Sequence, residues 1–367
     1  MSVNRCVIDL GALEHNFRVA RELAGPDRRI FCVVKADAYG HGMVEAAGAF
    51  ARAGAGAFCV FRVGEGVLLR RAGFDQPVLA LAQPMAEEAE LAVLHGITTT
   101  IYDEGPARDL AAVGQKVGRP ARAHVKVDSG MGRLGVNPEG LPGFLRKTDS
   151  LEGLHITGLF SHFAVADVPG DPYTDEQAAR FDEAARSCPD SGLLLHTANS
   201  AALMRGLVSD TGAARPGIML YGSPPHPDIP GADRLLPSMS LTTRICMVKD
   251  LPAGRSVSYG RTFTTNMPSR IASIPLGYEN GYPRILSNRA EALVRGRRVP
   301  QVGTICMNLC MLDVTDVPGV ETGDEVVLLG RQGDERITAE NLAARAGTIS
   351  YEIFCGIGKA NPRYYLR

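Results

Sequence analysis

The stretch Phe31-Cys32-Val33-Val34-Lys35-Ala36-Asp37-Ala38-Tyr39-Gly40-His41-Gly42 joins a short apolar run to a lysine, a tyrosine and two glycines. The apolar run predicts a buried strand, and the glycines predict a turn into a helix. A strand followed at once by a helix is the building unit of parallel α/β folds. The same unit recurs further along the chain.

Short β-rich runs alternate with stretches rich in Ala, Glu, Arg and Leu between about residues 30 and 222. The eight candidate strands are Cys32–Lys35, Ala57–Arg62, Pro77–Ala82, Thr98–Tyr102, Ala123–Asp128, Thr157–His162, Leu193–Thr197 and Ala213–Leu220. Helical character is clearest at Met43–Ala53, Ala86–His95 and Asp175–Ser187. This alternation predicts an α/β fold with an N-terminal (β/α)8 TIM barrel, and a doubly wound sheet is the competing arrangement.

The pattern changes at Gly222–Gly231, which is too rich in proline for a helix or a central strand and which we interpret as a linker. The runs that follow are short, β-rich and closely spaced, with one helix candidate at Ala339–Ala346: Met239–Met247, Ile271–Pro275, Ala292–Arg295, Cys310–Val314 and Glu325–Leu329. We predict a barrel domain over residues 1–230 and a C-terminal all-β domain over residues 231–367. A first strand near residues 5–10 is a candidate to pack with the second domain.

Composition excludes several classes of protein. The chain has 367 residues, of which 45% are apolar and 22% charged, with a net charge of −1. No basic patch stands out, which argues against a nucleic-acid partner. The first residues resemble neither a signal peptide nor a membrane span, so we expect a cytoplasmic protein with no membrane partner. The eight cysteines and eight histidines lack metal-site spacing, so we expect reduced thiols and no metal.

Lys35 and Tyr39 give the first chemical indication. A lysine at the end of a buried strand is partly desolvated, which lowers the pKa of its amine and makes it a better nucleophile toward a carbonyl. A solvated lysine at a strand end is the alternative. Tyr39 lies at the mouth of a turn bounded by glycines, where a phenol and loop N–H groups suit a phosphate. A Schiff-base lysine beside a phosphate site suggests pyridoxal phosphate.

Further polar residues follow the later candidate strands, at the end where barrel enzymes place their reactive groups. These segments are Asp128-Ser129-Gly130-Met131-Gly132-Arg133, Ser161-His162-Phe163, Thr197-Ala198-Asn199-Ser200 and Arg215-Pro216-Gly217-Ile218. Each alone has an ordinary structural explanation, such as a core histidine or a helix cap. Their joint placement at one face favours a catalytic site. Ser200 and Gly217 suit the usual phosphate position after the eighth strand.

Taken together, the motifs closely resemble those of the alanine racemases. The matching pieces run in the family's order over nearly the whole chain: the segments around Lys35, Lys126–Arg133, His162, Asn199-Ser200 and Arg215–Ile218, then Ser258-Tyr259-Gly260, Gly277-Tyr278, Ile305-Cys306-Met307 and Ser350-Tyr351-Glu352. The resemblance implies a barrel that carries pyridoxal phosphate, a β domain, and a homodimer whose active sites are shared between subunits.

The resemblance also implies a role for each matching residue. Lys35 would form the Schiff base with the cofactor. The phosphate would be held by Tyr39, Ser200, Ile218 and Tyr351, with backbone help at Gly217 and with Asn199 next to Ser200. Arg133 would contact the cofactor's phenolic oxygen near the substrate carboxylate, and Arg215, supported by His162, would face the pyridine nitrogen. The partner subunit's Tyr259 would act as the second base, and the partner's Tyr278 would shape the substrate entrance together with Met307.

The implied reaction interconverts L-alanine and D-alanine and supplies D-alanine for peptidoglycan. Racemisation removes the α-proton from one face and returns a proton to the other, so two bases avoid the need for one base to cross the ring. Lysine and tyrosine have ordinary pKa values near 10, so both pKa values must be lowered, and nearby arginines would do this for Lys35. Arg215 cannot accept a proton, so it would leave the pyridine nitrogen unprotonated and weaken the ring's electron withdrawal.

Two positions leave alternatives open. In the family, a lysine at the position of Lys126 can be carbamylated and orient the arginine, whereas an ordinary lysine near Asp128 is the other interpretation. Asn308 stands where the family usually has aspartate, which keeps a broad-specificity or serine racemase as the alternative function. A non-catalytic binding protein for pyridoxal phosphate would lack the β domain and Tyr259. Arg215 argues against a decarboxylase of similar two-domain plan.

Overall fold

The computed structural model describes residues 3–188, 192–207 and 212–367. The chain divides into two compact units. The barrel unit contains Leu13–Ala38 and Met43–Leu236, and the β unit contains the N-terminal residues through Ala12, Tyr39–Gly42 and Pro237–Arg367. The boundary expected after residue 230 stays a prediction.

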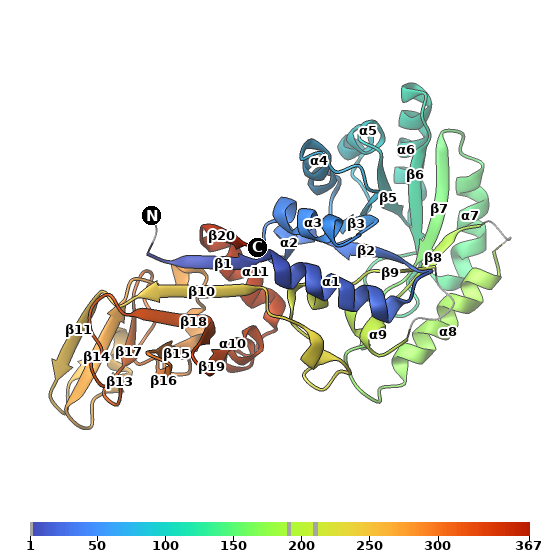
Figure 1. Cartoon of the computed structure of the whole chain (residues 1–367). Helices are drawn as coiled ribbons and strands as arrows, with labels where there is room; N and C mark the ends of the chain where they lie inside the picture. The colour runs from blue at the N-terminus through green and yellow to red at the C-terminus, as the bar shows by residue number, and fades with distance from the viewer. Residues whose placement is uncertain (1–2, 189–191, 208–211) are drawn as a thin grey trace. The chain divides into compact units, whose positions relative to one another are not determined.

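Eight parallel strands form the centre of the barrel unit (Figure 1). They pair in the order β8-β7-β6-β5-β4-β3-β2-β9, so the sheet follows chain order from β2 to β8 and is nearly closed by β9. Their bounds are β2 Arg29–Val33, β3 Ala57–Val60, β4 Val78–Ala80, β5 Ile97–Ile101, β6 Ala121–Lys126, β7 Leu154–Phe160, β8 Leu194–His196 and β9 Ala213–Ala214. This order confirms the predicted barrel, because a doubly wound sheet reverses its strand order at a switch point.

Helices connect the strands on the outside of the sheet (Figure 1). Their bounds are α1 Leu10–Ala24, α3 Met43–Arg52, α4 Val63–Arg71, α5 Ala86–Leu94, α6 Glu104–Val117, α7 Leu141–Asp149, α8 Tyr173–Arg186 and α9 Ser200–Met204. The last predicted strand was too long, since only Ala213–Ala214 is extended and Ile218–Tyr221 forms a 3-10 turn. Pro216 explains the difference, because it has no N–H to give to a strand ladder.

The chain leaves β2 through a left-handed helical turn, α2 Lys35–Tyr39. Ala36, Asp37, Ala38 and Tyr39 all have φ of 53° or 54°. This conformation costs about 1–2 kcal/mol for each residue with a Cβ. Side chains hold it in place: the Ala36 N–H donates to Glu65 Oε1 at 2.8 Å, and the Asp37 carboxylate accepts the Met43 N–H at 2.8 Å. The sequence predicted a turn at the two glycines but gave no sign of left-handed residues before them.

The β unit contains three sheets. The largest has the order β16-β15-β18-β10-β1-β20, with β19 paired to β18; the others are β11-β14-β17 and β12-β13. The bounds are β1 Arg5–Asp9, β10 Met239–Arg244, β11 Met247–Leu251, β12 Ser256–Val257, β13 Phe263–Thr264, β14 Ser269–Ile274, β15 Glu291–Val294, β16 Arg297–Pro300, β17 Cys310–Asp313, β18 Glu325–Gln332, β19 Glu335–Ile337 and β20 Arg363–Leu366. The N-terminal strand β1 lies between β10 and β20.

Two helices complete the β unit. α10 spans Ala339–Ala346, as predicted, whereas α11 Ser350–Ala360 was not predicted. The segment Tyr39–Gly42 packs directly on α11. A side chain at Gly358 would overlap the carbonyl oxygen of Gly40, and Arg363 donates to that same oxygen at 3.1 Å. Glycine is therefore required where this segment and α11 meet.

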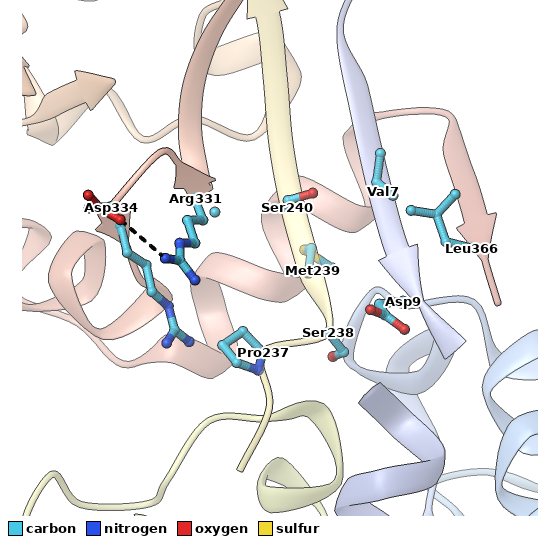
Figure 2. A pocket seen from close by; sticks show the side chains of 11 residues that line it. Val7, Asp9, Pro237, Ser238, Met239, Ser240, Arg331, Asp334 and Leu366 are labelled. Atoms are coloured by element: carbon cyan, nitrogen blue, oxygen red, sulfur yellow. Dashed lines mark ion pairs between the residues drawn. The ribbon is translucent and has the colours of Figure 1, made fainter. Parts of the chain in front are cut away.

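A cavity of about 390 Å³ opens in the β unit beside β1 and β10 (Figure 2). Its wall includes Val7, Asp9 and Met239, and Arg331 forms an ion pair with Asp334 at 3.7 Å on its rim. None of the residues that the sequence selected as catalytic or cofactor-binding lines this cavity. The candidate active site lies elsewhere.

We predict that Gly358→Ala destabilises the protein, because the added methyl group meets backbone that cannot move aside. The expected loss is about 1–3 kcal/mol in the free energy of unfolding, as for other overpacked sites. Gly356→Ala in the same helix is the matched control, since its Cβ would lie 3.4 Å from the Gly281 oxygen, an ordinary contact. Thermal unfolding of both variants checks this, and equal midpoints would contradict it.

Candidate active site

Lys35 begins the left-handed turn after β2 and is half-buried. Burial lowers the pKa of its amine below the ordinary value of 10.5. The positive charges of Arg133 and Arg215 lower the pKa further, while Cys59 and Glu65 act in the opposite direction. The amine is therefore nearer to its neutral, nucleophilic form than a surface lysine, as the sequence led us to expect.

Arg215 is buried at the end of the eighth strand and is held by neutral acceptors. Its guanidinium donates to the carbonyl oxygens of Ser161, His196 and Thr197 at 2.6–3.1 Å. It also lies 2.6 Å from His196 Nδ1 and 3.5 Å from His162 Nδ1. Burial lowers the pKa of Arg215 to about 10. The side chain stays protonated at neutral pH and acts only as a donor.

His162 and His196 are held as neutral imidazoles. Burial lowers the pKa of each well below the ordinary value of 6.5, and the charge of Arg215 lowers it further. His162 lies beside Arg215, as the resemblance implied. His196, together with His124 on β6, was not singled out in the sequence. A histidine inside an apolar strand run was the signal that could have identified both.

Arg133 stands on a loop that is organised by Asp128. The Asp128 carboxylate accepts the backbone N–H groups of Gly130, Gly132 and Arg133 at 3.0–3.1 Å. Burial raises the pKa of Asp128, but these backbone donors outweigh it and lower the pKa below 3.8. The carboxylate is thus ionised and engaged with the loop, which fixes the backbone from which the exposed Arg133 side chain extends.

Lys126 ends β6 and is buried. Its ammonium lies over the ring of Phe160, 5.7 Å from the centroid. Burial lowers the pKa of Lys126 to about 8, and Arg133 and Arg215 contribute to the lowering. Within the described ranges, no carboxylate lies within ion-pairing distance of this amine, so a larger share of it is neutral near pH 7 than for a surface lysine.

The loop after the eighth strand joins the start of α9. Asn199 caps this helix, because its Oδ1 accepts the Ala202 N–H at 3.0 Å. The Ser200 hydroxyl oxygen accepts the N–H groups of Gly217 at 2.8 Å and Met219 at 3.4 Å. This arrangement leaves the Ser200 hydroxyl hydrogen free to donate to an anion, while Ile218 opens the adjoining 3-10 turn.

The β unit brings the two remaining phosphate candidates together. The rings of Tyr39 and Tyr351 have centroids 5.8 Å apart and are tilted by 51°. Tyr351 lies in the first turn of α11, the helix on which Tyr39–Gly42 packs. Two phenols from opposite ends of the sequence therefore share one small region.

Tyr259, Tyr278 and Met307 form an exposed cluster on the β unit, with 73%, 41% and 54% of their surface accessible. Hydrogen bonds hold their loops together. The Tyr278 N–H donates to the carbonyl oxygen of Cys306 at 3.1 Å, and the Thr304 hydroxyl donates to the carbonyl oxygen of Tyr259 at 2.8 Å. Large exposed apolar and aromatic side chains gathered on one surface are typical of sites that bind another molecule.

The donor set fits pyridoxal phosphate. The barrel unit gathers four basic side chains, Lys35, Lys126, Arg133 and Arg215, and the charges of the two arginines lower the pKa values of the two lysines. None of them forms an ion pair with an acidic side chain in the part of the chain that the structure describes. Such a cluster suits a ligand that carries a phosphate and a phenolate, and the amine of Lys35 supplies the nucleophile for its aldehyde.

Metal and membrane features are absent from the described residues. These residues contain no group of three or more His, Cys, Asp or Glu side chains able to hold a metal ion. Among them, too, no helix has the length and apolar character needed to cross a bilayer.

Comparison with known proteins gives a consistent result over the whole chain. The model of the alanine racemase N-terminal domain matches residues 8–225, and that of the alanine racemase C-terminal domain matches residues 238–365. The alanine racemase of Syntrophobacter fumaroxidans is 45% identical over 354 residues, which cover 96% of this chain and 94% of the relative.

Solved structures agree with the sequence matches. The alanine racemase of Streptomyces coelicolor superposes with a TM-score of 0.93 at 35% identity, over 99% of this chain and 98% of the other. The alanine racemase of Bartonella henselae, described with covalently bound pyridoxal phosphate, gives a TM-score of 0.91 at 28% identity and covers all of both chains.

A barrel with a desolvated lysine amine among unpaired cations defines a class, the barrel enzymes that depend on pyridoxal phosphate. The domain matches and the sequence identity over the full length single out one family within this class. The chain belongs to the alanine racemase family and is an isomerase that acts on alanine, with pyridoxal phosphate as its cofactor.

Proposed function

We propose that the protein racemises alanine with two bases that come from different subunits of a homodimer, Lys35 of one and Tyr259 of the other. The observation that carries this proposal is the contrast between the two residues. Lys35 lies among cations in the barrel unit, whereas Tyr259 is 73% exposed on the β unit of the same chain. A tyrosine so placed has the accessibility that contact with a second copy requires.

Each barrel residue has a defined part in this proposal. Pyridoxal phosphate, when bound, supplies an electron-withdrawing ring linked to the substrate amine. Lys35 attaches the cofactor and then, as a free amine, moves a proton at the α-carbon. Arg133 orients the substrate carboxylate, and Arg215, steadied by His162, donates to the pyridine nitrogen without giving up a proton.

The phosphate is assigned to the residues that already lie in two small groups. Ser200, with Asn199 as its helix cap, Gly217 and Ile218 form the group at the end of the barrel strands. Tyr39 and Tyr351 form the pair on the β unit. Met307 and the partner's Tyr278 are assigned to the substrate entrance.

The proposed cellular role follows from the family. D-alanine would be supplied for peptidoglycan, and the enzyme would work in the cytoplasm. The eight cysteines are all free thiols, which accords with a reducing compartment.

We predict that the shared site can be tested with heterodimers made by co-expressing two differently tagged chains. Lys35→Ala and Tyr259→Phe homodimers should each lose at least about 100-fold in kcat, since a positioned base contributes about that much. A heterodimer of the two variants should keep roughly half of the wild-type activity, because the Lys35 of one chain meets the intact Tyr259 of the other.

The reciprocal heterodimer is the control. A chain that carries both substitutions, paired with a wild-type chain, should be inactive when Tyr259 acts across the interface and half-active when it acts within its own chain. Activity in this second heterodimer and none in the first would contradict the shared site.

We propose in addition that Lys126 is carbamylated, which would place an anion beside Arg133. Only a neutral amine reacts with carbon dioxide, and the lowered pKa of about 8 makes the neutral form far more populated than in a surface lysine. We predict a carbamate carbon signal in ¹³C NMR spectra with labelled bicarbonate, growing from pH 7 to 9 and missing in Lys126→Met. A wild-type spectrum at pH 9 that matches the Lys126→Met spectrum would refute the modification.

A broader amino-acid specificity is the second candidate function, and Asn308 is the observation that favours it. The Asn308 amide donates to Glu279 Oε2 at 3.2 Å, next to the loop that holds Tyr278 and Met307. An aspartate at this position would face the Glu279 carboxylate and be repelled by it. The substitution thus changes the charge at the proposed entrance.

We predict that alanine remains the best substrate, with serine next and with kcat/KM for lysine and arginine about 100-fold lower, because a small pocket excludes long side chains. Racemisation of both enantiomers of Ala, Ser, Arg and Lys by wild type and by Asn308→Asp checks this. Comparable rates on the long side chains would establish the broad-specificity alternative.

A further inference from the structure

Arg215 begins a chain of hydrogen bonds that includes two buried histidines, His196 and His124. Its Nη1 lies 2.6 Å from His196 Nδ1, and His196 Nε2 lies 2.8 Å from His124 Nδ1. All three side chains are at least 95% buried. His124 comes from β6 and His196 from β8, so this chain crosses the interior of the barrel beneath β7.

The position of every proton in this chain follows from Arg215. A guanidinium has only donors, so His196 Nδ1 must be the acceptor. A neutral His196 then carries its proton on Nε2 and donates it to His124 Nδ1. His124 in turn keeps its own proton on Nε2. Any other tautomer, or a protonated ring, would set a donor against a donor in a buried place.

The surroundings keep both imidazoles neutral and immobile. Burial lowers the pKa of His124 to about 3, and the charge of Arg215 adds to the lowering. The His196 ring stacks on Phe160, with centroids 4.9 Å apart and planes 5° apart, and on Phe31 at 5.6 Å.

Gly158 makes room for His124. A Cβ at position 158 would lie 2.9 Å from two atoms of that ring, Cε1 and Nε2. The backbone oxygen of Leu194 would lie still closer, at 2.7 Å, so glycine at this position serves both the strand packing and the imidazole.

We propose that His196 and His124 are positioning residues that fix the orientation of the Arg215 guanidinium through a one-way hydrogen-bond chain. The guanidinium also donates to backbone carbonyls, lies over the Phe160 ring and makes a longer contact to His162. The hydrogen-bond chain holds Nη1 in place. The guanidinium therefore keeps one orientation, in which its N–H groups can donate to the pyridine nitrogen of the cofactor. The inference rests on the role proposed above for Arg215.

Nitrogen NMR of histidine-labelled holoenzyme tests the chain directly. His196 and His124 should both appear as neutral rings protonated on Nε2 from pH 6 to 9, and single-histidine variants give the assignments. A protonated ring, or a proton on Nδ1 of either residue, would overturn the proposal. The protonation states are read from the unaltered holoenzyme and do not depend on catalysis.

Paired variants test the positioning role. His124→Leu removes the acceptor for His196, so the cofactor dissociation constant should rise and kcat fall by about tenfold each, with KM changed less than about threefold, as for one unpaired buried N–H. His124→Asn offers an oxygen near the place of Nδ1 and should restore both within about threefold. His155→Leu, on the exposed face of β7, is the control and should match wild type.

Two results would count against the positioning role. In one, His124→Leu lowers only the unfolding temperature and leaves cofactor binding and kcat unchanged. In the other, His124→Asn is as impaired as His124→Leu. Either would leave the shared-site racemase standing, because the heterodimer experiment judges that separately.

Discussion

The burial of Arg215 without a carboxylate is the constraint on which the site depends. A buried guanidinium must have its hydrogen bonds satisfied, and here backbone oxygens and imidazoles satisfy them. The positive charge is left uncompensated. It lowers the pKa values of Lys35, Lys126 and His162 and holds His196 neutral. Burial is the larger cause of each of these shifts, and the uncompensated charge of Arg215 acts in the same direction on all four groups.

This arrangement also explains why the barrel suits an anionic cofactor. Unpaired cations in a partly desolvated site are costly by themselves, and a ligand that carries negative charge offsets that cost. The same cations favour a neutral lysine amine, which is the form needed for attachment to an aldehyde. The cluster of cations therefore favours both the binding of the anionic cofactor and the neutral form of the lysine amine.

Much of the barrel could be predicted because its signals are local. Apolar runs marked the strands, and the helix cap at Asn199, the ordinary explanation that its residue type offers, is present in the structure, while its role toward the cofactor stays a prediction. Two features escaped prediction because they depend on residues far apart in the sequence. The left-handed residues Ala36–Tyr39 are held by distant side chains such as Glu65, and no local motif marks them. The contact between His196 and His124 depends on how strands pair around the barrel.

Helix α11 escaped prediction for a different reason. Its sequence is rich in β-branched, aromatic and glycine residues, which favour other conformations. Yet its buried residues Ser350, Ile353, Phe354, Ile357 and Gly358 recur at helical spacing, so the signal was present and was outweighed by composition. The site residues in the β unit, Tyr259 and Tyr278 above all, were selected by resemblance, since an exposed tyrosine has no chemical signature of its own.

The packing of Tyr39–Gly42 on α11 has a consequence for folding during synthesis on the ribosome. Gly40 and Arg363, which share a hydrogen bond, are 323 residues apart in the chain. At ordinary ribosome speeds the second is made roughly 15 to 65 seconds after the first. During that interval Tyr39–Gly42 lacks α11, the helix on which it packs in the finished protein. The pairing of Tyr39 with Tyr351 is therefore a late event, completed only as the last residues leave the ribosome.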